Sequence, residues 1–227
     1  MIKKIAAFAI AGLLATATAA AHADSVTYTL NNGGSLATTP GNYGTITLTN
    51  TATGVDVMET LVGTEYFVVT GAGNALSFNL LGDPSVSTVS AAMGTSLTSG
   101  YTLSSTSPDK ASPFGNFDYA IVCGIPPCTQ GGGGGLNSDN VSLSFSLAGF
   151  TLSDFNVLST GGDPNAYFAS DICIQQSGSG CVNNGTGNVG ATDPGTPMNP
   201  TPEPSSLIML GTGIVGAAGM LRRRFAA

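Results

Sequence analysis

Strict alternation of apolar and polar residues is the feature that most limits how this chain can fold. The clearest instance is the stretch 141–147, in which valine, leucine and phenylalanine side chains alternate with three serines. Side chains that alternate with a period of two point to opposite faces of a β-strand. The same pattern recurs in 43–49, 75–80 and 117–121. These segments are therefore predicted to be antiparallel strands with one face on a core and the other in water.

Four further segments have the composition of strands, namely 25–30, 55–62, 66–70 and 167–174. No amphipathic helix of more than a turn or two is evident. About eight short strands separated by turn residues favour an all-β domain, an antiparallel β-sandwich of jelly-roll type. A domain that covers residues 24–182 is large enough to bury a self-sufficient core.

Charge is scarce and unevenly placed. Charged residues make up 8% of the chain, and all basic residues except Lys110 lie close to one end or the other. From Asp24 to Thr201 there are twelve acidic residues and one lysine, so this part has a net charge of −11. A surface of that sign repels phosphate backbones. We therefore expect no nucleic-acid partner.

The first 23 residues have the order of an export signal. Two lysines precede the apolar run 5–14, and the small-residue pattern Ala21-His22-Ala23 follows. We expect a signal helix that signal peptidase removes after Ala23. A retained anchor is the alternative, but the apolar run is shorter than the ~20 residues that a membrane span requires.

Cleavage there also removes the only histidine, His22. The exported chain then has no imidazole for a nucleophilic triad or dyad, and none to bind zinc or copper. Carboxylate chemistry remains, with Asp118, Asp171 and Glu65 as candidates, but their spacing does not single out a converging pair. We therefore expect no enzyme, and no catalytic, cofactor or metal site.

Three features follow one another at the end of the chain: a proline-flanked glutamate, an uncharged and mostly apolar run, and a cluster of arginines. They are Pro202, Glu203 and Pro204, then residues 207–221, then Arg222, Arg223 and Arg224. A helix over 205–221 would be roughly 25 Å long, close to the ~30 Å hydrocarbon core of a bilayer. Arginines stay on the cytoplasmic side, so the preceding domain faces outward. A single transmembrane helix is therefore predicted.

This order resembles the PEP-CTERM sorting signal of Gram-negative bacteria, a tail also called the ice-binding protein C-terminal domain. The resemblance covers 201–227 and implies recognition by an exosortase, a membrane cysteine transpeptidase. It further implies that the proline-flanked Glu203 is the recognition element, that 207–221 is a transient inner-membrane anchor, and that the arginines are a cytoplasmic stop. Such proteins accompany exopolysaccharide and biofilm production. An ordinary C-terminal anchor with a proline-rich stalk is the alternative.

The exported region is similar to uncharacterised secreted proteins that carry the same tail. The similar segments are 114–119, 167–172 and 186–190. This resemblance implies one domain and no known activity.

Four cysteines form two close pairs in the sequence. An even number in an exported domain predicts disulfides. Of the three connectivities we favour the local one, which joins Cys123 to Cys128 and Cys173 to Cys181. The spacings C-x4-C and C-x7-C are poor for zinc.

These observations predict four parts: a signal peptide at 1–23, the exported domain at 24–182, a flexible linker at 183–201 and the sorting tail at 202–227. We expect a structural protein of the cell surface or extracellular matrix, in contact with exopolysaccharide, that ends in the envelope or outside the cell. The alternative is a carbohydrate-binding module whose tyrosines stack on sugar rings, although the chain has no tryptophan. The six tyrosines are Tyr28, Tyr43, Tyr66, Tyr101, Tyr119 and Tyr167.

Two surface features are left open. Threonines at alternate positions over 45–51 have the spacing of flat ice-binding faces, but we interpret a single row as the exposed side of an edge strand. The acidic loops at 137–140 and 161–164 lack the ligand spacing of known calcium loops.

Overall fold

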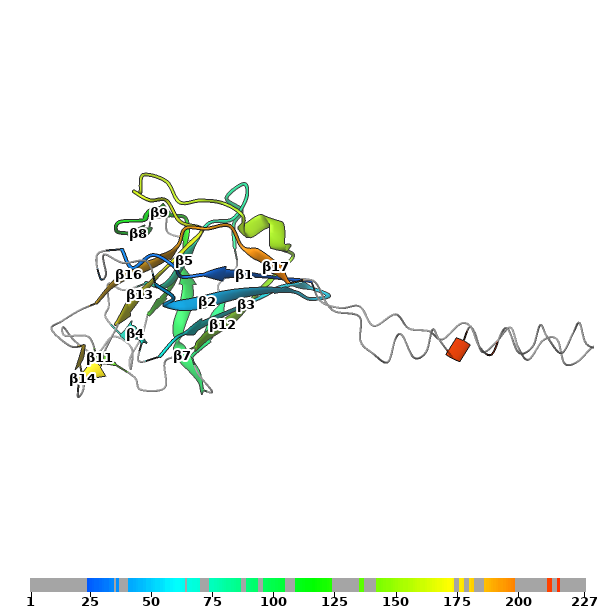
Figure 1. Cartoon of the computed structure of the whole chain (residues 1–227), viewed down its shortest axis with the longest axis horizontal. Helices are drawn as coiled ribbons and strands as arrows, with labels where there is room; N and C mark the ends of the chain where they lie inside the picture. The colour runs from blue at the N-terminus through cyan, green and yellow to red at the C-terminus, as the bar shows by residue number, and fades with distance from the viewer. Residues whose placement is uncertain are drawn as a thin grey trace, which may run out of the picture.

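The structure is a computed structural model of the chain, drawn in Figure 1. It describes residues 24–34, 36, 41–63, 65–69, 74–86, 89–93, 96–104, 109–123, 135–136, 142–173, 176–177, 180–181, 186–198, 212–213 and 216. The expected signal segment and nearly all of the tail lie outside these residues. Within the described residues, no helix has both the length and the apolar character needed to cross a membrane.

Strands dominate the described residues. Their bounds are β1 Ser25–Thr29, β2 Gly44–Asn50, β3 Gly54–Leu61, β4 Tyr66–Val69, β5 Asn74–Phe78, β6 Ser90–Met93, β7 Ser96–Ser104, β8 Asp109–Ala111, β9 Gly115–Phe117, β10 Tyr119–Cys123, β11 Gly135–Leu136, β12 Ser142–Ala148, β13 Phe168–Cys173, β14 Gln176–Ser177, β15 Gly180–Cys181, β16 Thr186–Ala191 and β17 Thr196–Met198. A 3-10 helix, η1, spans Leu152–Phe155. All named strand pairs are antiparallel, which confirms the predicted all-β antiparallel class.

The predicted strand at 117–121 is in fact two strands, β9 and β10, which meet at Asp118. The backbone N–H of Asp118 donates to the side chain of Asn79 at 2.7 Å. Phe117 and Tyr119 are both buried but belong to different apolar clusters. The break allows two residues that an unbroken strand would direct to one face to enter separate cores.

Thirteen of the described strands form one sheet that closes on itself. Along the sheet the order is β11-β4-β13-β5-β10-β7-β6-β12-β3-β2-β1-β17, and β16 pairs with β13. On its other side β16 meets the residues that follow β1. The N–H of Gly190 donates to the carbonyl of Asn32 at 2.8 Å, and the N–H groups of Asn31 and Asn32 donate to the carbonyl of Gly190 at 3.1 and 3.0 Å. Strand β16 therefore joins the two halves of the sheet.

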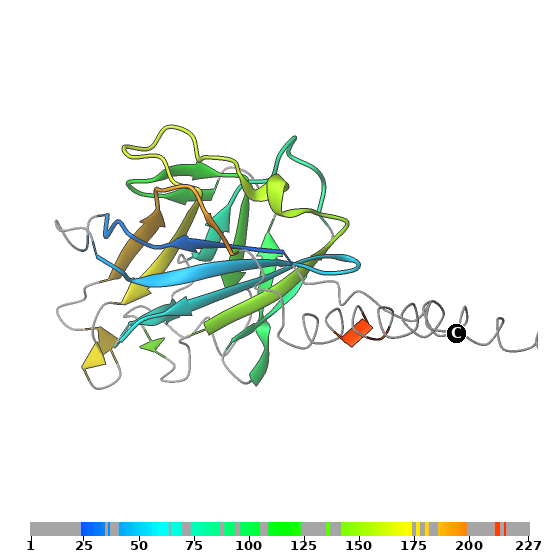
Figure 2. The ribbon, with the colours of Figure 1, turned by 45° about the vertical axis from the view of Figure 1, so that its right-hand side comes forward.

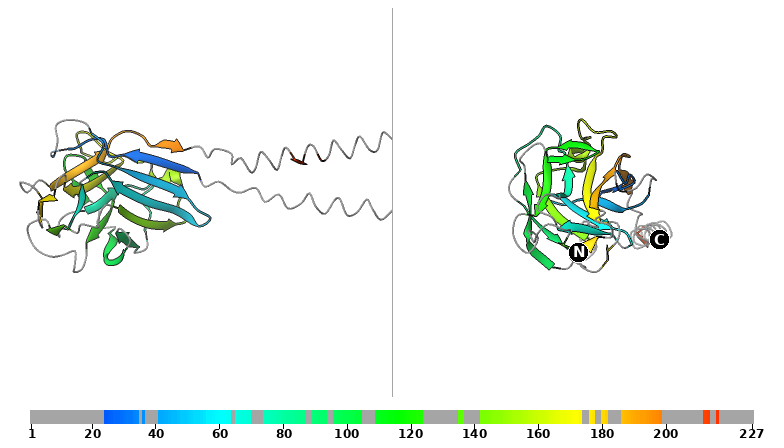
Figure 3. Two further views of the ribbon diagram at one scale, coloured as in Figure 1. Left: turned by 60° about the horizontal axis from the view of Figure 1, so that its bottom comes forward. Right: turned by 90° about the vertical axis from the view of Figure 1, so that its left-hand side faces the viewer.

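The two halves pack face to face as the layers of a sandwich would. Strands β1, β2, β3 and β12 form the front half, and β4, β5, β10 and β13 lie in the back half (Figures 2 and 3). The ring of Tyr28 meets that of Phe168 across the core, with 4.8 Å between centroids. The rings of Phe78 and Phe145 lie 5.9 Å apart. Aromatic contacts between the halves thus form the centre of the core.

A hairpin of β8 and β9 covers the outer face of the back half. Beneath it is a second small cluster of buried residues, Ala111, Phe114, Phe117, Ala166 and Ala169. The segment after η1 completes this cover, because the hydroxyl of Ser159 donates to the carbonyl of Phe114 at 2.5 Å and accepts from the N–H of Ala166 at 2.9 Å. The back half is therefore closed to solvent where the hairpin lies.

The structure corrects the flexible linker predicted for 183–201. Residues 186–191 form β16, residues 196–198 form β17, and β17 pairs with β1. The side chain of Asn31 accepts from the N–H of Thr192 at 3.1 Å and donates to Asp193 at 2.5 Å, which fixes the turn between these two strands. The exported domain therefore extends to residue 198.

Close packing explains the small residues of this segment. A Cβ atom on Gly190 would lie 2.6 Å from the ring of Phe114, and one on Gly195 would lie 2.3 Å from Val26. Such distances are shorter than van der Waals contact, so both positions require glycine. The glycines of this segment, which are typical of a flexible linker, here allow it to pack closely against Phe114 and Val26.

We predict that Gly190→Ala lowers the free energy of unfolding by about 1–3 kcal/mol, since the added methyl group overpacks the ring of Phe114. Chemical denaturation of the mature protein measures the change. In a Phe114→Leu background the same substitution should cost less, because the ring that it strikes has gone. Equal stability of Gly190→Ala and the parent would contradict the closing role of β16.

Candidate functional site

Among the described residues, no element covers the outer face of the front half, which carries mostly short polar side chains. Strands β1, β2, β3 and β12 turn their apolar residues toward the core, and the alternate residues point outward. The outward residues are Ser25, Thr27 and Thr29 on β1, Thr45, Thr47 and Thr49 on β2, Asp56, Met58 and Thr60 on β3, and Ser142, Ser144 and Ser146 on β12. All twelve are half-buried or exposed.

The strand register arranges these residues in rows across the sheet. The central row runs from Thr27 through Thr47 and Met58 to Ser144, and Ala92 of β6 follows. The hydroxyl oxygens of Thr27 and Thr47 are 3.2 Å apart, which is hydrogen-bond distance. The threonine row predicted to lie on an edge strand is instead on an internal strand, because β2 pairs with both β1 and β3. It is one row of a four-strand array of hydroxyl groups.

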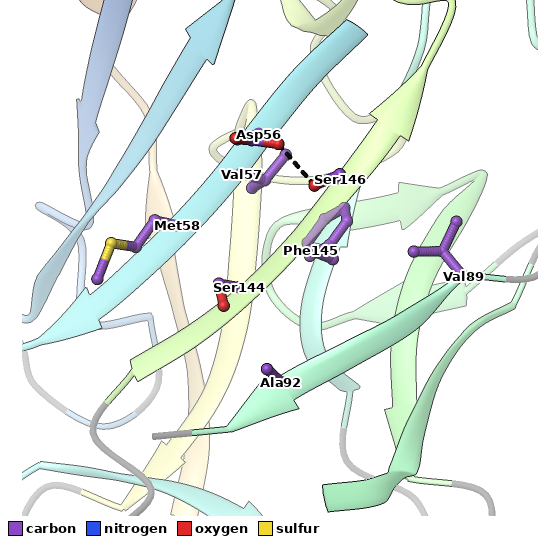
Figure 4. Close-up of a pocket in the computed structure, with 8 residues that line it drawn as sticks. All are labelled: Asp56, Val57, Met58, Val89, Ala92, Ser144, Phe145 and Ser146. Carbon is purple, nitrogen blue, oxygen red and sulfur yellow. Dashed lines mark hydrogen bonds between the residues drawn. The ribbon is translucent and has the colours of Figure 1, made fainter. Parts of the chain in front are cut away.

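A groove of about 520 Å³ opens on this face beside β12 (Figure 4). Strands β12 and β6 pair only through Leu143 and Ser144, so they part beyond that point. The lining comprises Asp56, Val57, Met58, Val89, Ala92, Ser144, Phe145 and Ser146. The groove thus combines apolar side chains with two hydroxyl groups and a carboxylate.

Among the described residues that line the groove, Asp56 is the ionisable one. It is exposed, and one of its carboxylate oxygens accepts a hydrogen bond from the hydroxyl of Ser146 at 2.6 Å, shown as the dashed line in Figure 4. Met58 beside it is 51% exposed. A carboxylate can accept about four hydrogen bonds, so Asp56 can accept more from a ligand.

A second carboxylate, Glu59, lies on the opposite side of β3, fully inside the core. Its cross-strand neighbours Ile46 and Leu143 are buried, and the hydroxyl of Ser170 from β13 donates to Oε1. The other oxygen, Oε2, has no hydrogen-bond partner among the described residues. Burial raises the pKa of Glu59 to about 8, against the lowering effect of the Ser170 hydrogen bond. Glu59 is therefore protonated at neutral pH.

The carboxylates considered for catalysis lie on three different elements. Glu65 follows β3, Asp118 separates β9 from β10, and Asp171 lies on β13 opposite Asn188. Burial raises the pKa of Glu65 to about 7 and that of Asp171 to about 6. No group of three or more His, Cys, Asp or Glu side chains suited to a metal ion occurs within the described part of the chain.

Most of the tyrosines with described side chains are buried. Tyr28 and Tyr43 belong to the main core, and Tyr167 packs on Tyr28 with 5.6 Å between ring centroids. The hydroxyl of Tyr119 donates to the carboxylate of Asp83 at 2.9 Å and to the carbonyl of Pro84. These four rings hold the domain together and do not form a platform for sugar stacking. The side chains of Tyr66 and Tyr101 are not among those that the structure describes.

The cysteine pairing is described in part. Cys173 is buried at the end of β13 and takes part in a disulfide. The hairpin of β14 and β15 then brings the backbone of Cys181 opposite Gln176. Cys128 lies outside the described residues, so the pairs Cys123–Cys128 and Cys173–Cys181 stay a prediction.

We predict that a peptide mass map of the unreduced mature protein contains the linked pairs Cys123–Cys128 and Cys173–Cys181. The short hairpin that follows β13 favours the second pair, because it returns the chain toward Cys173 within a few residues. Peptides that join the first pair of cysteines to the second, or four free thiols, would contradict this pairing.

The raised pKa of Glu59 predicts that the fold loses stability as pH rises. The folded state keeps a proton that the unfolded state releases near pH 4.5, so the stabilisation is complete below pH 4.5 and is lost between pH 4.5 and about 8. The contribution of this group falls by about 1.4 kcal/mol per pH unit in that window. Glu59→Gln should remove that slope, as measured by denaturation at each pH.

Glu65→Gln is the matched control. The pKa of Glu65 is raised to about 7, so Glu65 changes the pH dependence of stability only below about pH 7. Glu65→Gln should therefore keep the loss of stability between pH 7 and 8 that Glu59 causes. If the parent and Glu59→Gln lose stability equally across pH 5 to 8, Glu59 does not titrate as the burial implies.

The proline-flanked motif lies outside the described residues, and comparison with known families places it. The family model described as the PEP-CTERM protein-sorting motif matches residues 200–224. This range contains Pro202, Glu203 and Pro204 together with Arg222, Arg223 and Arg224. No curated protein and no solved structure matches the chain. The chain is therefore an exported protein that carries a C-terminal PEP-CTERM sorting tail.

Proposed function

We propose that this protein is a structural component of the cell surface or extracellular matrix. It is released or retained there after an exosortase has recognised and cleaved its tail. The observation that carries the proposal is the sorting motif at 200–224, directly after a folded all-β domain. The domain is proposed to be a sandwich of jelly-roll type, cross-linked by the two local disulfides Cys123–Cys128 and Cys173–Cys181. The predicted transmembrane helix at 207–221 would hold it at the inner membrane until cleavage.

The position of β17 supports processing close to the folded domain. Strand β17 ends at Met198, and only three residues separate it from Pro202. Four residue steps span at most about 14 Å even when fully extended. An enzyme that acts near Glu203 would therefore work beside the sheet edge and not at the end of a long tether.

Both points of attachment belong to this same edge. Ser25 begins β1, two residues after the expected signal-peptidase site, and its Cα partner on β17 is Met198. The start of the mature chain and the start of the sorting tail thus leave the domain side by side. Pairing of β1 with β17 requires both ends of the domain to be in place.

A non-catalytic role agrees with the chemistry of the domain. The chain has no histidine after His22, so the domain offers no imidazole base. The broad hydroxyl face of β1, β2, β3 and β12, which no described element covers, suits contact with matrix material in place of an enclosed reaction site.

The test is the intact mass of the protein recovered from the envelope and the medium. We expect a mature chain that begins at Asp24 and lacks Arg222, Arg223 and Arg224. Glu203→Ala should keep the arginines and accumulate in the membrane fraction, while Asp163→Ala, which removes an exposed carboxylate from the domain, should mature like the parent. Mature extracellular protein that retains its final arginines would contradict the proposal.

A further inference from the structure

We propose that the groove beside β12 and the adjoining hydroxyl face bind an extended, neutral polysaccharide. The proposal rests on the proposed function, because a protein sorted to the surface meets such polymers there. The ligand-binding region consists of Asp56, Met58, Ser144 and Ser146 around the groove, with the threonines of β2 next to it. The buried tyrosines take no part.

The groove has the two kinds of contact that a sugar ring requires. A pyranose has an apolar C–H face and a rim of hydroxyl groups, so it needs an apolar surface beside hydrogen-bonding groups. Met58, which is half-exposed, and the half-buried Val89 and Ala92 supply the accessible apolar surface, while Val57 and Phe145 lie beneath it in the core. Ser144, Ser146 and Asp56 supply hydroxyl and carboxylate groups on the same surface (Figure 4). A groove of about 520 Å³ is within the size range of small-ligand sites.

The hydroxyl rows extend this surface beyond one sugar. Neighbouring strands are about 4.8 Å apart, and residues on one face of a strand repeat every ~7 Å, so the array offers a donor or acceptor every few ångströms in two directions. From the groove, Met58 and Thr47 lead across the sheet to Thr27. A serine or threonine hydroxyl can both donate and accept, which matches the hydroxyl groups of a polysaccharide. A chain that crosses the strands would meet these groups in succession.

Charge selects a neutral polymer. Asp56 contributes a carboxylate, and the lining residues that the structure describes include no lysine, arginine or histidine. The single cation of the domain, Lys110, lies on β8, which belongs to the hairpin that covers the back half. An anionic polysaccharide would therefore meet a carboxylate without a counter-charge, and its binding would be opposed.

The experiment is native gel electrophoresis of the mature protein through gels that contain the extracellular polysaccharide of the producing bacterium. The polysaccharide is first separated into neutral and acidic fractions by anion exchange. We expect retardation by the neutral fraction and none by the acidic fraction. Asp56→Ala and Met58→Ala should each weaken the apparent affinity about fivefold to tenfold, through loss of a charged acceptor and of apolar contact.

Matched controls remove the same chemistry elsewhere on the surface. Asp163→Ala deletes an exposed carboxylate, and Leu81→Ala deletes an apolar side chain that is 65% exposed; both should bind like the parent. Melting temperatures establish that each variant is folded. Absence of retardation by the neutral fraction, retardation by the acidic fraction instead, or equal binding by the groove and control variants overturns the proposal. If the mature protein has the expected mass but does not bind the neutral fraction, the binding proposal fails and the sorting proposal stands. If the protein binds the neutral fraction but its tail is not cleaved, the sorting proposal fails and the binding proposal stands.

Discussion

The backbone contact between Gly190 and Asn32 is the constraint on which the rest of the structure depends. Strand β16 pairs with β13 along six residues, and its Gly190 bridges to Asn32 in the segment that follows β1. On this side of the molecule the bridge acts together with the bonds of the Asn31 side chain to Thr192 and Asp193 and with the pairing of β17 to β1. On the other side the two halves are joined through β7 and β6. The bridge lies at the same seam as the contact between the rings of Tyr28 and Phe168. The contact is available because Gly190 has no side chain on the face where the ring of Phe114 lies. A residue late in the chain thus completes a core that begins at residue 25, so the fold requires nearly the whole exported segment before it is stable.

The domain holds carboxyl groups in buried or half-buried positions with few basic residues to pair with them: Glu59 is buried in the core, and Glu65, Asp109 and Asp171 are half-buried. Lys110 is the single basic residue between Asp24 and Thr201, so buried carboxyls reduce their charge by keeping a proton. Burial raises the pKa values of Glu59, Glu65, Asp109 and Asp171 in the same direction. All four therefore favour the folded state under mildly acidic conditions and oppose it as pH rises. Asp56 is exposed on the other side of β3 from Glu59. Strand β3 thus carries two carboxyl groups, Glu59 inside the core and Asp56 on the surface where a ligand can reach it.

Sequence reasoning succeeds for this fold wherever one face of a strand is buried and the other is wet. Alternation places β2 and β12 within one residue at each end, because each packs on the core with Leu, Ile or Phe and faces water with Ser or Thr. It fails for β16, whose TGNVGA sequence contains one large apolar residue, since its glycines serve a close approach that only tertiary structure reveals. It also joins β9 to β10, because nothing local indicates that Asn79 turns the chain at Asp118. The groove was not predicted either, because Asp56 and Ser146 are ninety residues apart in sequence and meet only through the register of β3 and β12.

The difference between the two outer faces follows from the same topology and bears on how the protein would work at a surface. The β8–β9 hairpin covers part of the back half, whereas no described element covers the hydroxyl rows of the front half, which ends at the edge where β1 and β17 meet. Strand β12, which borders the groove, is three strand spacings from β1, or about 14 Å. A polymer bound there would lie close to both chain ends, and therefore close to the point at which the tail is cut. Attachment at one edge and binding on the adjoining face would let a small domain connect matrix to envelope through a single rigid sheet, without a second domain or a long linker.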